Sequence, residues 1–248
     1  MIIFHNHSLA LEDDYDFLFL ESIRRNFTMN NKTELKANFI NIVKNDPIFL
    51  GLLFPELGKE MVTSQKGTKH KTKNAWEHSQ VLVHWVLKEE PDDVVLLIAA
   101  LFHDVGKPLV PTWDDEKKKY RFFKHDAVGA DIVQRLLEEN AIFSFLSEED
   151  KKGIVWLVRN HMVPHNFANQ GWTSKSTKKF IRKHMLNNRE ALGSDPVKRF
   201  DQLGILSTYD TFDCHPGEER QSETFFAHDK LRKEMTTLAY NYLNGVWK

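Results

Sequence analysis

The sequence predicts an all-α helical bundle with one small β-hairpin inserted in it. Glycine and proline number only 11 and 8 in 248 residues, and this scarcity favours helices over a turn-rich β fold. Apolar residues recur at helical spacing along most of the chain, as expected of amphipathic helices. Residues 108–124 break this spacing with two short apolar and aromatic segments around an acidic turn, a pattern typical of a hairpin.

The chain is predicted to divide into an N-terminal helical extension, residues 1–45, and one domain, residues 46–248, that ends in a long helix. Apolar residues at 18, 20 and 23 suggest a short helix in the extension, and residues 34–44 suggest a second. Prolines at 47 and 55 bracket a short apolar helix. A polar, lysine-rich loop follows at residues 63–73.

Four helices are predicted in the middle of the chain. Residues 76–87 carry one apolar face, whereas residues 91–102 are apolar almost throughout, as in a helix buried on most sides. The third helix begins at His125 after the hairpin. The fourth begins behind the N-cap Ser147, and Pro164 is expected to stop it and leave a loop at residues 163–171.

Three further helices are predicted in the C-terminal part. The first follows a Thr173 cap and carries exposed basic residues, which either form an ordinary solvated face or contact phosphate; the sequence leaves both open. They are Lys175, Lys178, Lys179 and Arg182. The second helix opens at residues 195–196 and places Asp210 on its apolar stripe. The last spans residues 218–243.

Composition excludes several classes of protein. The net charge of −1 excludes a strongly basic nucleic-acid binder but allows a local basic patch. The single cysteine excludes a disulfide framework and a thiolate metal site. No apolar run reaches the roughly 18 residues of a membrane span, and acidic residues stand where a signal peptide would be basic. A cytoplasmic protein is therefore expected.

Polar residues at helix ends and on apolar faces point to chemistry. The apolar run 94–102 leads directly into His103 and Asp104, and a charge at the end of a core helix is costly unless it is paired. A divalent cation can take a carboxylate oxygen and a neutral imidazole nitrogen together. The alternative for such a pair alone is a capped helix end. His78 and Asp210 are also expected to point inward, which favours the cation.

The order of these residues resembles the HD superfamily of metal-dependent phosphohydrolases, and Gly106 and Lys107 after the pair extend the resemblance. Residues 50–215 are more closely similar to the HD domain that follows the polymerase part of bacterial CCA-adding tRNA nucleotidyltransferases. That similarity is carried by WEHSQVL, FFKHDAVGA, VRNHM, WTSKSTKKFIRK and LSTYDTFD. The acidic motif of the polymerase part is missing, so nucleotide addition is not expected.

The resemblance implies an HD-domain helical bundle with one divalent ion, Mn²⁺, Ni²⁺, Co²⁺, Fe²⁺ or Mg²⁺, held by four residues: His78, His103, Asp104 and Asp210. His125 and His161 are the implied ligands of a second ion. The family has a second histidine where this chain has Asn160, so one ion or two stays open. His165 could substitute for the missing imidazole or be exposed.

The resemblance also implies roles in catalysis. Asp104 would orient the attacking water, and Lys107, His125 and His161 would neutralise phosphoryl charge as it develops. His125 or His161 would alternatively protonate the leaving group. Lys107 and the basic helix, through Lys175, Lys178, Lys179 and Arg182, would bind the substrate.

The expected function is metal-dependent hydrolysis of nucleotide or RNA-end phosphoesters, of the 2′,3′-cyclic phosphodiesterase or phosphatase type. One alternative is another nucleotide hydrolase acting on ppGpp, a dNTP or a cyclic nucleotide. Others are a non-catalytic RNA-binding module and a di-iron oxygenase, which needs two well-ligated irons. The sequence predicts no oligomeric state.

Overall fold

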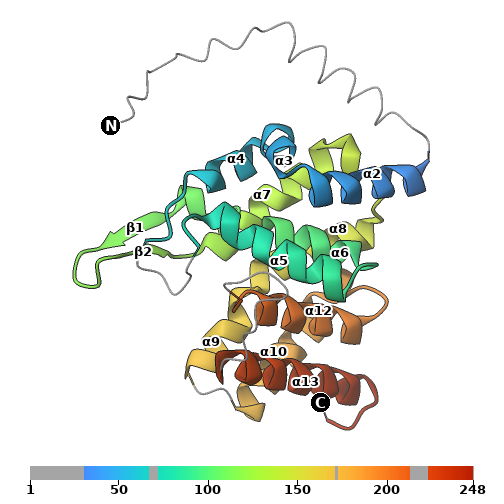
Figure 1. Ribbon diagram of the computed structural model, residues 1–248. Coiled ribbons are helices and arrows are strands. Elements are labelled where there is room, and N and C mark those ends of the chain that lie inside the picture. The colour runs from blue at the N-terminus through green and yellow to red at the C-terminus, as the bar shows by residue number, and fades with distance from the viewer. Residues whose placement is uncertain (1–30, 67–71, 171–172, 213–222, 248) are drawn as a thin grey trace, which may run out of the picture.

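The computed structural model describes residues 31–66, 72–170, 173–212 and 223–247 (Figure 1). The regular secondary structure of these residues is helical apart from one two-stranded hairpin and an isolated bridge between Ser64 and Asn74, so the predicted all-α class with an inserted hairpin is confirmed. Several predictions fall outside the described residues: the short helix near residue 20, part of the lysine-rich loop, and the start of the last helix at 218–222.

Three helices form the layer at the top of Figure 1: α2 (Lys32–Asn45), α3 (Pro47–Leu53) and α4 (Pro55–Met61). Only one helix was predicted after α2, but Pro55 opens a second, because proline is well suited to the first turn of a helix. Phe39 of α2 packs edge-on against Phe143, with 5.5 Å between ring centroids. Helix α2 therefore shares the common core, and the proposed division at residue 46 stays a prediction.

The central layer contains α5 (Ala75–Glu89), α6 (Val94–Phe102), α7 (His125–Glu139) and α8 (Glu148–Asn160). A short turn of 3-10 helix between α7 and α8, η2 (Ala141–Phe143), packs against α2. Every residue of α6 after Val94 is buried, as its continuous apolar sequence predicts. Asp93 caps α6 by accepting from the amide of Leu96, and Ser147 begins α8 with a capping box. These caps fix where the helices start and so where their polar ends lie.

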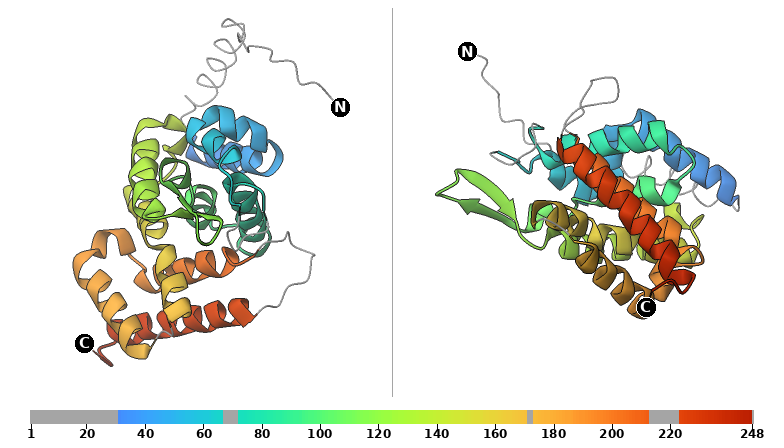
Figure 2. Two further views of the ribbon diagram at one scale, coloured as in Figure 1. Left: turned by 90° about the vertical axis from the view of Figure 1, so that its left-hand side faces the viewer. Right: turned by 90° about the horizontal axis from the view of Figure 1, so that it is seen from below.

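The hairpin lies between α6 and α7 and projects from the helical body in both Figures 1 and 2. A 3-10 turn, η1 (Lys107–Leu109), leads into β1 (Pro111–Asp114), which pairs antiparallel with β2 (Lys119–Phe122). Arg121 donates to Asp114 across the strands at 2.6 Å. The predicted hairpin at residues 108–124 is confirmed.

The lower layer contains α9 (Met162–Gln170), α10 (Ser174–Asn187), α11 (Arg189–Leu192), α12 (Pro196–Tyr209) and α13 (Glu223–Leu243). The predicted loop at 163–171 is wrong: a new helix, α9, starts one residue after His161, so Pro164 falls in its first turn, where proline is tolerated. Helix α13 packs closely on α12 at Gly204, where an added Cβ would lie 2.5 Å from Cγ of Arg232.

The described helices include none that combines the length and the apolar character needed to cross a membrane. The expected cytoplasmic location stays a prediction.

Candidate metal centre

Two clusters of histidine and aspartate lie side by side at the centre of the bundle. In the first, His78, His103 and Asp210 each offer a ligand atom, and these atoms lie within 4.8 Å of one another. His78 Nε2 is 2.6 Å from Asp210 Oδ1, and His103 Nε2 is 3.6 Å from the same oxygen. All three residues are buried, and 132 positions separate His78 from Asp210 along the chain.

The second cluster consists of Asp104, His125 and His161, also buried and within the same 4.8 Å limit. The Nε2 atoms of His125 and His161 lie 3.1 Å apart, and Asp104 Oδ1 is 3.2 Å from the former. The other oxygen, Asp104 Oδ2, lies 3.2 Å from His103 Nε2. Asp104 therefore stands between the two clusters and can serve both.

Helix ends deliver these side chains. His103, His161 and Asp210 are the C-cap residues of α6, α8 and α12, while His78 lies in the first turn of α5 and His125 begins α7. The C-terminal end of a helix carries partial negative charge from its unpaired carbonyls. Three such ends meeting two carboxylates make this position favourable for a cation.

Backbone carbonyls fix the orientation of three imidazoles. The Nδ1 atoms of His103, His125 and His161 lie 2.7–2.8 Å from the carbonyl oxygens of the residues three positions earlier, Ala100, Phe122 and Val158. A carbonyl only accepts, so each Nδ1 carries the proton and each Nε2 can present its lone pair to the centre. This is the second-sphere arrangement usual for histidine ligands of metals.

The electrostatics favour positive charge in the centre. Burial opposes charge on His103, yet the carboxylates of Asp104 and Asp210 outweigh it and raise the pKa of His103 to about 10. Burial likewise opposes ionisation of Asp104 and Asp210, but neighbouring cationic groups hold the pKa of each carboxyl well below its usual range. Burial, followed by repulsion from His125 and His103, lowers the pKa of His161 well below normal.

The residues present fit a divalent cation. Three buried atoms of the centre, His103 Nε2, Asp104 Oδ2 and His165 Nε2, lie within ion-pair distance of an oppositely charged group but form no hydrogen bond of good geometry with the described residues. The facing Nε2 atoms of His125 and His161 also need a proton or a cation between them, since both Nδ1 atoms carry the protons. Imidazole and carboxylate without thiolate suit Mn²⁺, Fe²⁺, Co²⁺, Ni²⁺ or Mg²⁺.

The structure places His165 and Asn160, the two residues that bear on a second ion. His165, on α9, is 15% exposed in its side chain, and its Nε2 lies 2.6 Å from Asp210 Oδ2, so it joins the first cluster rather than the second. Asn160 is buried and donates to the carbonyl of Trp156 at 2.8 Å. Its amide is thus engaged with its own helix, and the number of ions stays a prediction.

Lys107 lies at the edge of the centre and is almost fully buried. Its Nζ lies 2.5 Å from Asp104 Oδ2 and donates to Gln65 Oε1 at 2.8 Å. This geometry fixes the ammonium group beside the carboxylate shared by both clusters. A cation at that position can face a phosphate bound in the centre.

Sequence reasoning missed Glu60, a fully buried carboxyl of α4. Its Oε2 accepts from Ser79 Oγ at 3.0 Å, while its Oε1 has no hydrogen-bond partner among the described residues. Burial, followed by repulsion from Asp104, raises its pKa to about 8, which favours the protonated form near neutral pH. The helical spacing from the buried Leu57 was the available indication that this residue faces inward.

The basic helix α10 is exposed along the predicted face, which comprises Lys175, Lys178, Lys179 and Arg182. Two contacts join α10 to the C-terminal part of the chain: Ser174 donates to Glu234 at 2.7 Å, and the Lys178 ammonium lies 5.5 Å from the Trp247 ring. The role of this face in binding substrate stays a prediction.

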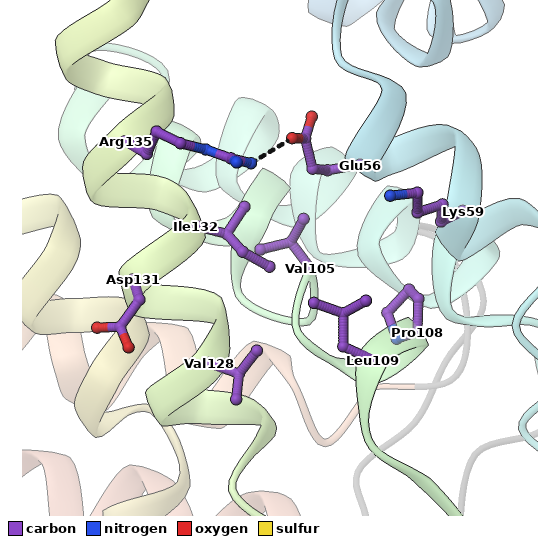
Figure 3. Close-up of a pocket in the computed structure, with 9 residues that line it drawn as sticks. All are labelled: Glu56, Lys59, Val105, Pro108, Leu109, Val128, Asp131, Ile132 and Arg135. Carbon is purple, nitrogen blue, oxygen red and sulfur yellow. Dashed lines mark hydrogen bonds and ion pairs between the residues drawn. The ribbon is translucent and has the colours of Figure 1, made fainter.

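A pocket of about 390 Å³ lies between α4, η1 and α7 (Figure 3). An ion pair of 2.7 Å between Arg135 and Glu56 crosses its rim, and Val105 and Ile132 line it. Its lining residues include none of the imidazoles or carboxylates of the two clusters. The pocket is therefore separate from the candidate centre.

A family model described as HD domain matches residues 73–197, half of the chain. The chain belongs to the HD-domain family. The HD superfamily consists of metal-dependent hydrolases, and the match spans His78 on α5, the His103–Asp104 pair, and His125 and His161 of the second cluster. Asp210, which completes the first cluster, lies beyond the matched residues.

Two curated relatives of this HD domain are tRNA nucleotidyltransferases. A CC-adding tRNA nucleotidyltransferase from Thermus thermophilus is 38% identical over 116 residues, and an A-adding tRNA nucleotidyltransferase from Deinococcus radiodurans is 35% identical over 115 residues. Each match covers 46% of this chain and 25% of the relative. The chain thus matches about a quarter of the length of these proteins, and the predicted resemblance is confirmed.

Proposed function

We propose that this HD domain is a metal-dependent hydrolase of nucleotide or RNA-end phosphoesters, of the 2′,3′-cyclic phosphodiesterase or phosphatase type. One observation carries the proposal: two imidazole–carboxylate clusters share Asp104 and present their Nε2 atoms and carboxylate oxygens to one buried centre. The relatives named for tRNA nucleotidyl transfer support an RNA end as the substrate.

His78, His103, Asp104 and Asp210 would hold the ion, and His125 and His161 would hold a second one if it binds. Such an ion supplies Lewis acidity and lowers the pKa of bound water. The chain supplies the rest: Asp104 accepts a hydrogen bond from the attacking water and so orients it toward phosphorus.

Lys107 neutralises charge that develops on the phosphoryl oxygens, because its ammonium group is fixed beside Asp104. His125 Nε2 is the group suited to give a proton to the leaving oxygen when no second ion occupies that nitrogen. The side chain of His125 is 8% exposed and that of His161 is fully buried, so the leaving group would face His125.

The test is hydrolysis of 2′,3′-cyclic AMP by the metal-replete protein and by Asp104→Asn. The variant keeps the volume of the side chain but loses the charge, and we expect turnover to fall at least a hundredfold, about 2.7 kcal/mol in transition-state stabilisation. Asp131→Asn, which changes an exposed aspartate paired with Arg159, is the matched control and should act as wild type.

Unchanged turnover in Asp104→Asn would contradict the proposal. A parallel panel with ppGpp, a dNTP and a 3′,5′-cyclic nucleotide separates the substrate classes. The preferred substrate is the one with the highest turnover by the wild type and with the expected fall in turnover in Asp104→Asn. Binding of RNA without turnover in Mn²⁺, Ni²⁺, Co²⁺ and Mg²⁺ would identify a non-catalytic module instead.

A further inference from the structure

The hairpin carries an aromatic face that begins at the candidate centre. Paired residues of an antiparallel ladder share one face, and alternate residues along a strand do too. The register pairs Trp113 with Tyr120 and Pro111 with Phe122, so the three aromatic rings lie on the same face. The ring centroids of Tyr120 and Phe122 are 6.3 Å apart, and those of Trp113 and Tyr120 are 5.0 Å apart.

Lys107 connects this face to the metal centre. Its ammonium group lies 5.5 Å from the centroid of the Phe122 ring and 2.5 Å from Asp104 Oδ2. The carbonyl of Phe122 also accepts from Nδ1 of His125 at 2.7 Å. The rings of Phe122, Tyr120 and Trp113 therefore follow one another outward from the cation that would face the phosphate.

The outermost ring of the aromatic face is partly exposed to solvent. Trp113 is 38% exposed on an arm that projects from the body (Figure 1). Its indole N–H is already satisfied within the hairpin, because it donates to Asp115 at 3.0 Å. That hydrogen bond also fixes the orientation of the ring. An exposed, oriented indole can bind a flat partner with little loss of conformational entropy.

The charge of the hairpin is complementary to a phosphate backbone. Arg121 pairs with Asp114, and Lys118 lies 3.7 Å from Asp115. The hairpin residues outside these pairs carry one negative charge, on Glu116, and three positive charges, on Lys117, Lys119 and Lys124. A protein partner of the aromatic face would be favoured by continuous apolar surface, whereas rings interleaved with lysines are the pattern of single-strand binding sites.

We propose that the aromatic face, Trp113, Tyr120 and Phe122, is a stacking platform for single-stranded nucleic acid whose end lies at Lys107. The inference rests on the proposed function and deepens it, since the substrate is then a strand with unpaired bases near the reacting end rather than a free mononucleotide. Bases stack on Trp113 and Tyr120, and the lysines of the hairpin contact the phosphates.

The experiment measures binding in EDTA, so that it does not depend on turnover. The probe is a fluorescein-labelled single-stranded RNA of about twelve nucleotides, within the site sizes typical of such proteins. Fluorescence anisotropy gives the Kd of the full chain. Because one base stacked on an aromatic ring contributes roughly fivefold to a hundredfold in affinity, Trp113→Ala should weaken binding by that factor.

Three further variants and one further ligand complete the design. Trp113→Phe keeps a flat ring and should recover most of the affinity, and Lys119→Gln should reduce the dependence of the Kd on salt. Tyr240→Ala removes an aromatic residue that is 59% exposed on α13 and should bind as wild type. The same RNA annealed to its complement should bind more weakly, because its bases are no longer free to stack.

Equal affinity of Trp113→Ala and Tyr240→Ala, or of single-stranded and duplex RNA, would overturn the platform. Absence of RNA binding by the wild type would overturn it too and would indicate a protein partner for the aromatic face. If RNA binds as expected but no phosphoester is hydrolysed, the proposed function fails and the platform stands.

Discussion

The substitution Gly106→Ala tests how the turn after the His103–Asp104 pair positions the second cluster. An added Cβ at Gly106 would lie 2.2 Å from the carbonyl oxygen of His125 and 2.6 Å from the amide nitrogen of Gly129. Both neighbours are backbone atoms of α7, so rotation of a side chain cannot relieve the contact. The gap between 2.2 Å and the 3.4 Å of ordinary contact requires α7 to move by about 1.2 Å.

This displacement sets the expected magnitudes. Overpacking of a tight contact costs about 1–3 kcal/mol, which in a chain of this size lowers the Tm by roughly 2–12 °C. His125 begins α7 and its Nε2 lies 3.2 Å from Asp104 Oδ1. Metal ligands must be placed within about 0.2 Å of their ideal distances. The displacement of α7 by about 1.2 Å should therefore also weaken ion binding at the second cluster.

Thermal unfolding with and without added Mn²⁺ measures both effects, because a ligand of the native state raises the Tm. Gly106→Ala should have a lower Tm than the wild type, and added Mn²⁺ should raise its Tm by less. Gly58→Ala is the matched control, since its Cβ would meet the Gly51 carbonyl at a milder 3.3 Å. A Tm and a Mn²⁺ response equal to those of the control would refute the reasoning.

Two further predictions concern the lower layer. His184 accepts at Nδ1 from Trp156 Nε1 at 2.9 Å, and burial, followed by repulsion from Lys183, lowers its pKa to about 4. The unfolded chain, with the ordinary value of 6.5, binds more protons between pH 4 and 6.5, so stability should fall as the pH drops through that window. His184→Asn, which keeps an acceptor near the same position, should flatten this dependence in urea titrations, whereas His84→Asn on the exposed face of α5 should not; equal pH profiles for both variants would exclude His184 as the cause. Gly204→Ala should separate α13 from α12, because its Cβ would lie 3.0 Å from the Arg232 Cα, and it should cost about 1–3 kcal/mol. Hydrogen exchange should then accelerate in residues 223–243, and unchanged protection there would show that the interface yields without cost.

The fold class was predictable because hydrophobic period and helix caps are local properties of the sequence. Helix α6 was evident from its apolar run, and Ser147 and Thr173 begin the helices they were expected to cap. Proline misled the prediction at residue 164, where a stop was expected. The same residue type opens helices and ends them, and tertiary packing of α8 and α9 decides which.

The centre was predictable only in part, because its geometry joins distant segments. His78 and Asp210 could be assigned to apolar faces, but their separation of 2.6 Å depends on how α5 meets α12. The contact of His165 with Asp210 arises from α9, a helix that was not expected. Glu60 remained unnoticed because its polar neighbours in sequence resemble an exposed turn, and burial of a carboxyl is a tertiary property.

The most direct test of a cation at this centre is an anomalous difference map from crystals of the protein soaked in Mn²⁺. We predict a peak bounded by His78, His103, Asp104 and Asp210, with a further peak toward His125 and His161 if two ions bind. A map with no peak among these residues, from crystals in which Mn²⁺ is seen elsewhere, would contradict the assignment of the centre.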